Sequence, residues 1–239
     1  MPTLLLVRPE NRQAADIALC TQYGWHALPF APICIVPQTD ECFRLPEKIA
    51  AAPAIFWVSP TAVEIAATHC SPKILGSLKT HIAVGKATAA ALHAIGISEI
   101  HYSAIGNDSE AALALPIWQT LPHGATILLI RGQNGREMLP EKLRAQDFKV
   151  DYAEIYRREP KTLDWTSFQA AIPDAAWVTS SEMARELFVQ VPPQISQKLK
   201  SLIYFTHHTR IADTLYALGA QKIYVIRQLS DMFTLFQAA

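Results

Sequence analysis

Three features of the sequence predict an α/β fold made of two related halves. Short, uninterrupted apolar runs alternate with stretches of helical character along the chain. Such runs suit strands that are buried on both faces of a parallel sheet, and their alternation with helices is typical of the α/β class. Several landmarks also return at a fixed distance along the chain, which indicates a duplicated unit.

Strands are expected at six apolar runs, which are Leu4–Val7, Ile55–Val58, Ile82–Val84, Ile127–Ile130, Ala176–Val178 and Leu202–Phe205. In each half the first strand is followed by an arginine and a helix, and the second by a Ser/Thr turn and a helix. The third leads through a short junction into a helix that is closed by a glycine and followed by another strand. Gly96 and Gly219 are predicted to end these helices as C′ residues, because glycine accepts the left-handed conformation needed there.

The repeat is predicted from a constant offset. Arg8 and Arg131, each directly after an apolar run, lie 123 positions apart. Ser59 and Ser180 lie 121 positions apart, so a two-residue insertion or deletion intervenes. The self-similarity of α/β proteins in general explains recurring strands and glycines, but it does not explain a recurring offset. The offset of 123 also separates Asn11 from Asn134, Pro37 from Pro160, and Gly96 from Gly219.

Two segments are predicted to be linkers. The stretches Pro37–Pro53 and Pro160–Pro173 are rich in proline and polar residues, as linkers commonly are. Two layouts are open on this evidence. A cut near residue 120 gives tandem domains, whereas a swapped layout packs the first unit of each half with the remaining units of the other half.

The composition describes a globular chain without a strong charge. Of the 239 residues, 50% are hydrophobic and 18% are charged, with 21 basic and 21 acidic residues. We therefore expect neither a nucleic-acid partner nor a membrane partner that is held by net charge. The cysteines lack metal-ligand or redox spacing, and the apolar run Leu4–Val7 is too short for a signal peptide or a membrane span. Buried free thiols and a cytoplasmic location are the expectation.

The candidate ligand-binding residues directly follow the apolar runs. In open parallel sheets, ligands bind beyond the carboxyl ends of the strands, where helix N-termini present free N–H groups to anions. Hydroxyls, glycines and cations dominate these segments, and such a lining suits a ligand with several carboxylates or phosphates. The segments are Arg8–Glu10, Ser59–Thr61, Gly85–Thr88, Arg131–Arg136, Thr179–Ser181 and Thr206–Thr209.

Some of these residues also have a purely structural interpretation. Ser59 before Pro60 is typical of an N-cap with proline at N1, and Thr179–Glu182 fits a capping box with Thr179 as the cap. Capping alone accounts for both. The segment Arg131–Arg136 is the most specific signal, because two arginines flank two glycines at a strand-to-helix junction. Tyr156, in an extended segment before the second linker, is either a packing residue or faces a cleft between domains.

Other kinds of site are not predicted. Gly85-Lys86 lacks the earlier glycine and the following Ser/Thr of a phosphate loop, and no Gly-x-Gly-x-x-Gly motif occurs. The adjacent His207 and His208 point apart and have no carboxylate or cysteine cluster beside them. We therefore predict no metal site.

Taken in order, the motifs resemble the uroporphyrinogen-III synthase family. Each motif is weak alone, but the ordered set is specific and spans nearly the whole chain. The motifs are Leu6–Pro9, Val58–Val63, Ala83–Gly96, Leu129–Leu139, Tyr156–Arg158 and Thr179–Glu182.

The resemblance implies two α/β domains, each a parallel sheet flanked by helices, joined by a two-stranded linker with the active site in the cleft between them. It favours the swapped layout, with residues 1–36 and 160–239 in a discontinuous first domain and residues 38–157 in an inserted second domain. The linkers then lie near residue 37 and at residues 158–160.

The resemblance also implies an activity. The family cyclises linear hydroxymethylbilane without a cofactor, with loss of water and inversion of ring D, in heme biosynthesis. It implies Tyr156 as the hydrogen-bond donor to the departing hydroxyl, a monomeric enzyme, and a transient contact with the enzyme that supplies the substrate. The residues expected to bind the substrate's acetate and propionate groups are Arg8, Ser59, Lys86, Thr88, Arg131, Gly132, Arg136, Thr179, Ser180, His208 and Thr209.

This chain departs from the family pattern at one junction. The counterpart of Gly85 and Thr88 in the other half is normally also a glycine and a threonine, but the offset places His208 opposite Gly85 and Ile211 opposite Thr88. Thr209 could supply the missing hydroxyl, or His208 could contact a carboxylate directly.

Two rival functions remain. The main rival is a non-catalytic two-domain protein that binds an anionic metabolite or regulates another protein, and it would place no demand on Tyr156. A receiver-like or flavodoxin-like regulator is the weaker rival. Receivers need clustered acidic residues at the strand ends, where this chain has Arg, Ser, Gly and His.

Overall fold

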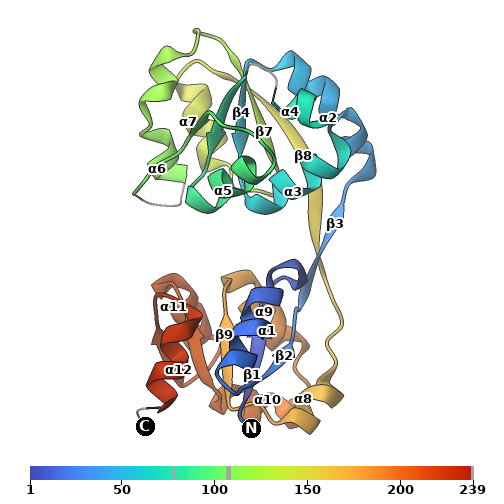
Figure 1. Cartoon of the computed structure of the whole chain (residues 1–239), viewed down its shortest axis with the longest axis vertical. Helices are drawn as coiled ribbons and strands as arrows, with labels where there is room; N and C mark the ends of the chain where they lie inside the picture. Colours follow the sequence, from blue (N-terminus) through green and yellow to red (C-terminus); the bar gives the residue numbers. More distant parts are fainter. Residues whose placement is uncertain (77–78, 106–108, 238–239) are drawn as a thin grey trace. The chain divides into compact units, whose positions relative to one another are not determined.

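The computed structural model describes residues 1–76, 79–105 and 109–237. The chain divides into two compact units. Unit 1 contains Met1–Cys34 and Glu159–Ala239, and unit 2 contains Ile35–Arg158. Each unit is built on a sheet with helices on both faces (Figure 1). The predicted fold class, α/β with two domains, is confirmed.

The sheet of unit 1 has the order β11-β10-β9-β1-β2, and all its strand pairs are parallel. Its elements are β1 (Thr3–Val7), η1 (Glu10–Arg12), α1 (Ala14–Gln22), β2 (His26–Pro29), α8 (Trp165–Ala171), β9 (Ala175–Val178), α9 (Ser181–Gln190), α10 (Pro193–Ser201), β10 (Ile203–Thr206), α11 (Thr209–Ala217), β11 (Lys222–Val225) and α12 (Leu229–Gln237).

The sheet of unit 2 has the order β3-β8-β7-β4-β5-β6, with parallel pairing from β8 to β6. Its elements are β3 (Ile33–Pro37), α2 (Thr39–Ala51), β4 (Ala54–Trp57), α3 (Pro60–His69), α4 (Pro72–Leu75), β5 (Thr80–Ala83), α5 (Lys86–Ala94), β6 (Ile100–His101), α6 (Ser109–Leu113), η2 (Pro116–Thr120), β7 (Thr126–Gly132), α7 (Met138–Ala145) and β8 (Lys149–Pro160).

The two sheets repeat one topology. The offset of 123 makes β1 equivalent to β7, β2 equivalent to the first part of β8, and β5 and β6 equivalent to β10 and β11. Strands β4 and β9 are equivalent at the offset of 121. The equivalent strands then stand in the same order, β2-β1-β9-β10-β11 in unit 1 and β8-β7-β4-β5-β6 in unit 2. The first two strands of each half therefore lie beside the last three strands of the other half.

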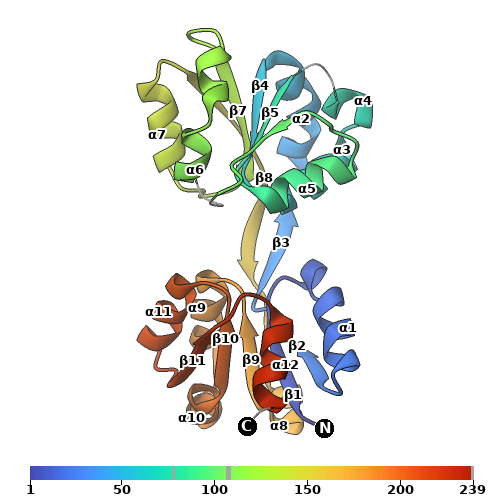
Figure 2. The same cartoon turned by 60° about the vertical axis from the view of Figure 1, so that its left-hand side comes forward.

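Each sheet separates two hydrophobic clusters. In unit 2 one face packs against α2, α3 and α5, and the other packs against α6, η2 and α7. In unit 1 one face packs against α8, α9, α10 and α11, and the other against α1 and α12. Figure 2 shows α12 lying across the sheet of unit 1. Strands covered on both faces need apolar side chains at every position, which explains the uninterrupted apolar runs.

The stretches 37–53 and 160–173 contain helices, so the prediction that they are linkers throughout is wrong. The stretch 37–53 holds α2, in which Cys42, Leu45 and Ile49 recur at helical spacing and pack into the core. This burial outweighs the backbone hydrogen bond that Pro46 removes from the helix. The stretch 160–173 holds α8, which is capped by Asp164. The chain passes between the units inside β3 and inside β8, which are neighbours in the sheet.

The glycines predicted to end helices are confirmed. Gly96 and Gly219 directly follow the C-cap residues of α5 and α11, and their φ angles are 90° and 94°.

The thiols differ in burial. The four cysteines are free; Cys20, Cys42 and Cys70 are buried, whereas Cys34 is half-buried, so the prediction of buried thiols is wrong for Cys34. Burial raises the pKa of Cys20 and of Cys70 to about 11.

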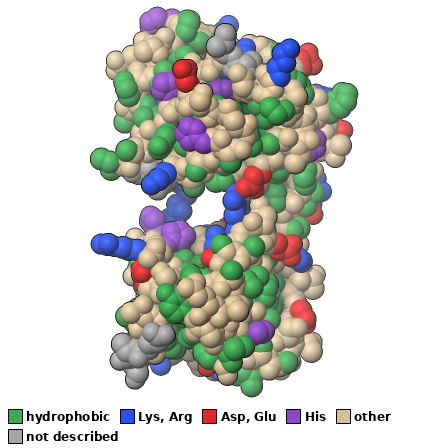
Figure 3. Space-filling model, in the orientation of Figure 1, with side chains coloured by type: hydrophobic (Ala, Val, Ile, Leu, Met, Phe, Trp, Pro, Cys, Tyr) green, Lys and Arg blue, Asp and Glu red, His purple; other side chains and the backbone are tan. Residues whose placement is uncertain are grey.

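No helix in the described part of the chain is long and apolar enough to cross a membrane. The face of the molecule in Figure 3 carries both acidic and basic side chains, in keeping with 21 residues of each sign.

Candidate functional site

The carboxyl edge of the unit 2 sheet brings together several of the predicted residues. Strands β4, β5 and β7 are parallel neighbours or near neighbours in the sheet, so their carboxyl ends meet at one edge. Helices α3 and α5 begin directly after β4 and β5. Their N-termini therefore stand side by side at this edge.

Ser59 caps α3. Its Oγ accepts a hydrogen bond from the backbone N–H of Ala62 at 3.1 Å, and Pro60 occupies the first helical turn. The predicted N-cap is confirmed. Ser59 is half-buried and lines a pocket, so capping and a ligand contact are compatible at this residue.

The first turn of α5 is built differently. Gly85 is the N-cap in an extended conformation, and none of the described side chains caps this helix. A pocket of about 630 Å³ lies against it, lined by Val58–Pro60, Val84–Thr88 and Ala90. Lys86 is exposed at this pocket, and Thr88 is buried. Backbone N–H groups at a helix start beside a lysine favour an anionic ligand.

Tyr156 reaches this site from β8 because the strand carries a bulge. Strands β7 and β8 pair in register up to Arg131 opposite Glu154, and then Gly132 lies opposite Tyr156. Ile155 is skipped, and both Ile155 and Tyr156 consequently pack into the cluster beneath α2, α3 and α5. Successive side chains of a regular strand point to opposite faces, so the bulge re-aims the tyrosine.

The Tyr156 side chain has contacts at its hydroxyl and at its ring. Its hydroxyl lies 3.1 Å from Ser59 Oγ, and Arg158 Nη2 donates to that hydroxyl at 3.4 Å. The ring packs directly on Gly132, where an added Cβ would lie 2.4 Å from a ring carbon. Any larger residue at position 132 would displace the ring. The side chain of Tyr156 is only 1% exposed.

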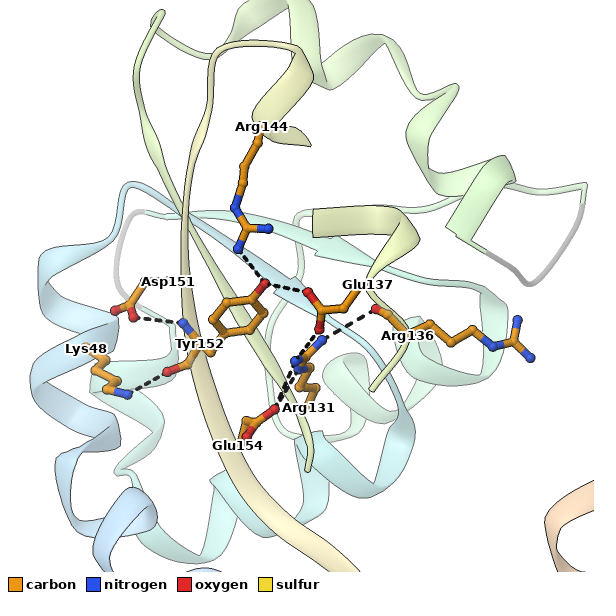
Figure 4. A network of polar contacts seen from close by, with 8 residues as sticks. All are labelled: Lys48, Arg131, Arg136, Glu137, Arg144, Asp151, Tyr152 and Glu154. Atoms are coloured by element: carbon orange, nitrogen blue, oxygen red, sulfur yellow. Dashed lines mark hydrogen bonds and ion pairs between the residues drawn. The ribbon is translucent and has the colours of Figure 1, made fainter. Parts of the chain in front are cut away.

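Arg131 is not free to bind an anion, in contrast to the prediction. Its buried guanidinium pairs with Glu137 at 2.8 Å and with Glu154 at 2.9 Å (Figure 4). Burial by itself would lower the pKa of Arg131, but its hydrogen bonds to the two carboxylates raise that pKa above the ordinary value. The same contacts lower the pKa of Glu137.

The network around Arg131 stiffens the loop after β7. Arg131 also lies 4.3 Å above the ring of Tyr152, whose hydroxyl donates to Glu137 and accepts from Arg144 (Figure 4). The backbone of the loop is tied to β8 as well, because Gln133 N donates to Tyr156 O at 2.7 Å. Arg131 thus holds Glu137 and Glu154 in place on either side of this loop, while Arg136 is exposed.

The carboxyl edge of the unit 1 sheet holds the remaining predicted residues. Ser180 rather than Thr179 caps α9, with its Oγ accepting from Met183 N at 3.4 Å, so the predicted capping residue is wrong by one position. Thr179 lies between β9 and Ser180, and its N–H donates to Val7 O at 3.4 Å. Arg8 pairs with the carboxylate of Asp16 in α1.

At the divergent junction His208 is the N-cap of α11. Its Nδ1 accepts a hydrogen bond from Arg210 N at 3.0 Å, and Thr209 is the first residue of the helix. The neighbouring His207 packs against the ring of Trp177, and burial, aided by the charges of His208 and Arg8, lowers the pKa of His207. Among the described residues, no group of His, Cys, Asp and Glu could hold a metal ion.

Comparison of the sequence with known proteins identifies the family. The family model described as uroporphyrinogen-III synthase HemD matches residues 15–231. The chain belongs to the uroporphyrinogen-III synthase family. It is 30% identical to the uroporphyrinogen-III synthase of Escherichia coli K12 over 202 residues, which is 80% of each chain. This family consists of cyclising lyases of tetrapyrrole biosynthesis, as the resemblance implied.

Two solved structures show the fold of this family. A mutant uroporphyrinogen III synthase from the extremely thermophilic bacterium Thermus thermophilus is 16% identical, with a TM-score of 0.64 and coverage of 100% of this chain and 98% of that chain. The enzyme from Helicobacter pylori 26695 is also 16% identical, with a TM-score of 0.64 and coverage of 100% and 99%.

The structure thus sorts the predicted residues into three groups, apart from Arg136, which is exposed in unit 2. Ser59, Lys86 and Thr88 line one pocket, with Tyr156 and Gly132 packed behind Ser59. A second group lies at the edge of the unit 1 sheet, and Arg131 is held inside unit 2. Sequence reasoning missed Arg158 as a neighbour of the Tyr156 hydroxyl. Its position two residues further along an extended strand was the available signal, because such residues share a face.

Proposed function

We propose that this chain converts linear hydroxymethylbilane into uroporphyrinogen III, with loss of water and inversion of ring D, without a cofactor. The observation that carries the proposal is the hydroxyl pair at the unit 2 pocket, where Tyr156 Oη lies 3.1 Å from Ser59 Oγ and Ser59 lines the pocket. Departure of the substrate's hydroxyl requires a proton donor, and a phenol supplies a proton from a neutral group.

The chemistry makes few demands on the protein besides that donor. Loss of water leaves a cationic azafulvene, which the substituted carbon of ring D attacks to give a spiro intermediate. This intermediate fragments and closes again with ring D turned over. The protein must hold the chain so that the spiro attack is faster than direct closure, and this is catalysis by positioning.

The acetate and propionate groups of the substrate are the anions by which the protein can bind it. In unit 2 the uncapped N-terminus of α5, the ammonium group of Lys86 and the hydroxyl of Thr88 line the pocket. Backbone N–H groups at a helix start bind carboxylates without any particular side chain. We therefore expect single substitutions of Lys86 or Thr88 to raise KM more than they lower kcat.

The proposal extends to unit 1 and to the assembly. The proposed ligands there are Arg8, Thr179, Ser180, His208 and Thr209, with Arg136 as a further cation of unit 2, and the two compact units are proposed to be the two domains of the family. We further propose a monomer in the cytoplasm that receives its unstable substrate by transient contact with the enzyme that makes it.

The deciding experiment is an isomer analysis. The purified protein is supplied with enzymatically generated hydroxymethylbilane, and the uroporphyrins are resolved after oxidation. The type III isomer is expected, whereas type I alone is the product of unassisted closure and would refute the proposal. That result would also favour the alternative of a non-catalytic protein that binds an anionic metabolite.

A further inference from the structure

Ser59 stands between the buried tyrosine and the pocket. Tyr156 is 1% exposed and is not among the residues that line the pocket, whereas Ser59 is partly exposed and lines it. The two oxygens are 3.1 Å apart, within hydrogen-bond distance. A substrate in this pocket therefore meets the serine hydroxyl before it meets the phenol.

Either oxygen could be the donor in the hydrogen bond between Ser59 and Tyr156, and the other partners of the two hydroxyls favour one direction. Ser59 Oγ already accepts from Ala62 N at 3.1 Å, and a hydroxyl oxygen has one further acceptor site and one proton. Of the described groups that contact Tyr156 Oη, Arg158 carries only donors, so the phenolic proton finds its acceptor in Ser59. Buried hydroxyls are nearly always satisfied in this way. That direction leaves the proton of Ser59 available to a ligand in the pocket that Ser59 lines.

We propose that Ser59 relays the proton of Tyr156 to the departing hydroxyl of the substrate. Ser59 is then the catalytic residue that touches the substrate, and Tyr156 is the acid that returns a proton to Ser59. This inference rests on the proposed function, and it assigns to Ser59 a role beyond carboxylate binding.

The proton balance of the relay closes over one turnover. Ser59 gives its proton to the hydroxyl group, the C–O bond breaks with its electron pair on oxygen, and water leaves. Tyr156 gives its proton to Ser59, and a phenolate remains. When ring D closes again, its α-carbon releases one proton, which returns through Ser59 to the phenolate.

The neighbours of Tyr156 suit this direction of transfer. The Arg158 guanidinium lies 5.4 Å from the ring centroid and contacts the hydroxyl, so it stabilises a phenolate by charge and by hydrogen bonding. An aliphatic hydroxyl alone is a weak acid, and a phenol behind it makes the transfer feasible. The serine also keeps a neutral group, rather than the guanidinium, against the cationic substrate.

The test distinguishes the proposed proton relay of Ser59 from its role as the N-cap of α3. Ser59→Gly keeps an acceptable N-cap residue but removes the hydroxyl, since glycine at this position costs little stability. We expect Ser59→Gly and Tyr156→Phe each to lower kcat about 10²-fold, the lower end of the usual range for general acid catalysis, with little change in KM. The double variant should be no slower than either single variant, because both remove the same relay.

Two further variants serve as controls. Ser59→Thr keeps both the cap and the hydroxyl and should restore most of kcat. Asp164→Gly removes the cap of α8, where Asp164 accepts from Thr166 N and Ser167 N at 3.1 Å, and should leave kcat unchanged.

The outcomes distinguish the relay from the proposed function. If the wild-type protein gives type III product and Ser59→Gly retains its kcat while Tyr156→Phe loses it, the relay is overturned and direct donation by Tyr156 stands. A rise in KM alone for Ser59→Gly also overturns the relay and returns Ser59 to carboxylate binding. If the wild-type protein gives only type I product, the proposed function fails and the relay fails with it.

Discussion

The equivalent strands β5 and β10 each lead into a helix start, and the two helix starts are built differently. In unit 2, α5 begins at Gly85 without a side-chain cap from any described residue, and its N–H groups face a pocket. In unit 1, α11 begins at His208, whose ring accepts the N–H of Arg210. The imidazole of His208 thus accepts a hydrogen bond from a backbone N–H at the start of α11. At the start of α5 no side chain of a described residue does so, and the N–H groups stay available to a ligand. Duplication preserved the scaffold and let the carboxyl edges of its two sheets diverge.

The bulged strand of unit 2 has no such counterpart in unit 1. The offset of 123 places Pro9 opposite Gly132 and Ile33 opposite Tyr156. Ile33 is buried in the core of unit 1, so its position serves packing. Gly132 leaves room for the ring of Tyr156, and the isoleucine at the equivalent position of unit 1 has no hydroxyl to donate. The acid of the proposed reaction therefore belongs to unit 2.

The largest effect is expected from removing that acid. Tyr156→Phe should lower kcat by about 10²-fold or more, because the ring still packs on Gly132 but no proton is available. The rate of type III formation measures it. The matched control is Tyr204→Phe in unit 1, a buried tyrosine whose hydroxyl donates to Leu199 O at 2.8 Å. Tyr204→Phe should lower Tm and leave kcat unchanged, and equal kcat losses in the two variants would contradict the assignment.

Gly132→Ala should affect both stability and rate. Its Cβ would lie 2.4 Å from the Tyr156 ring, so the ring must move away from Ser59. We expect a loss of about 1–3 kcal/mol in the free energy of unfolding, typical of overpacking, together with a lower kcat. Urea denaturation gives the stability. In combination with Tyr156→Leu the stability loss should shrink, and strictly additive losses would show that the ring is not what the methyl group meets.

The next effect concerns the divergent junction of unit 1. His208→Ala removes the acceptor for Arg210 N and should cost about 1 kcal/mol of unfolding free energy, as losses of helix caps typically do. His208→Asn supplies another good N-cap and should cost little. Thermal denaturation of the two variants measures the difference, and equal Tm values would mean that the imidazole does not cap α11.

The smallest effect on stability is expected from substituting the acidic partners of the buried Arg131 and the half-buried Arg8. Arg131 has two carboxylates, and the Glu137 side chain is 50% exposed, so Glu137→Gln should cost only about 0.2–1 kcal/mol. Asp16→Asn should cost more, because Asp16 is 11% exposed beside Arg8. Chemical denaturation at neutral pH compares them, and a larger loss for Glu137→Gln would invert the comparison.

The contribution of Glu137 should also depend on pH. Its pKa is lower in the folded protein than the ordinary value of 4.5, because Arg131 favours the charged form. The stabilisation is therefore fully present above about pH 4.5 and is lost as the pH falls through the lowered value. Wild-type and Glu137→Gln stabilities should converge in acid, and a constant difference down to low pH would disprove the ion pair.

Local patterns were sufficient for part of the site. Ser59 before Pro60 predicted an N-cap, and the structure has that cap. The free-cation interpretation of Arg131 failed because Glu154 lies 23 positions away and reaches it only across the β7–β8 pairing. The linker prediction at 37–53 failed because helix α2 forms through packing against the sheet, which proline content alone does not reveal.

The sequence by itself determined the α/β class, the strands at the six apolar runs and the repeat. Burial on both sheet faces demands uninterrupted apolar runs, and duplication leaves a constant offset. Only the tertiary structure decided that Tyr156 meets Ser59, 97 positions away. That contact needs the bulge between β7 and β8 and the glycine beneath the ring. Strand register depends on the partner strand as much as on the strand itself, so no local pattern contains it.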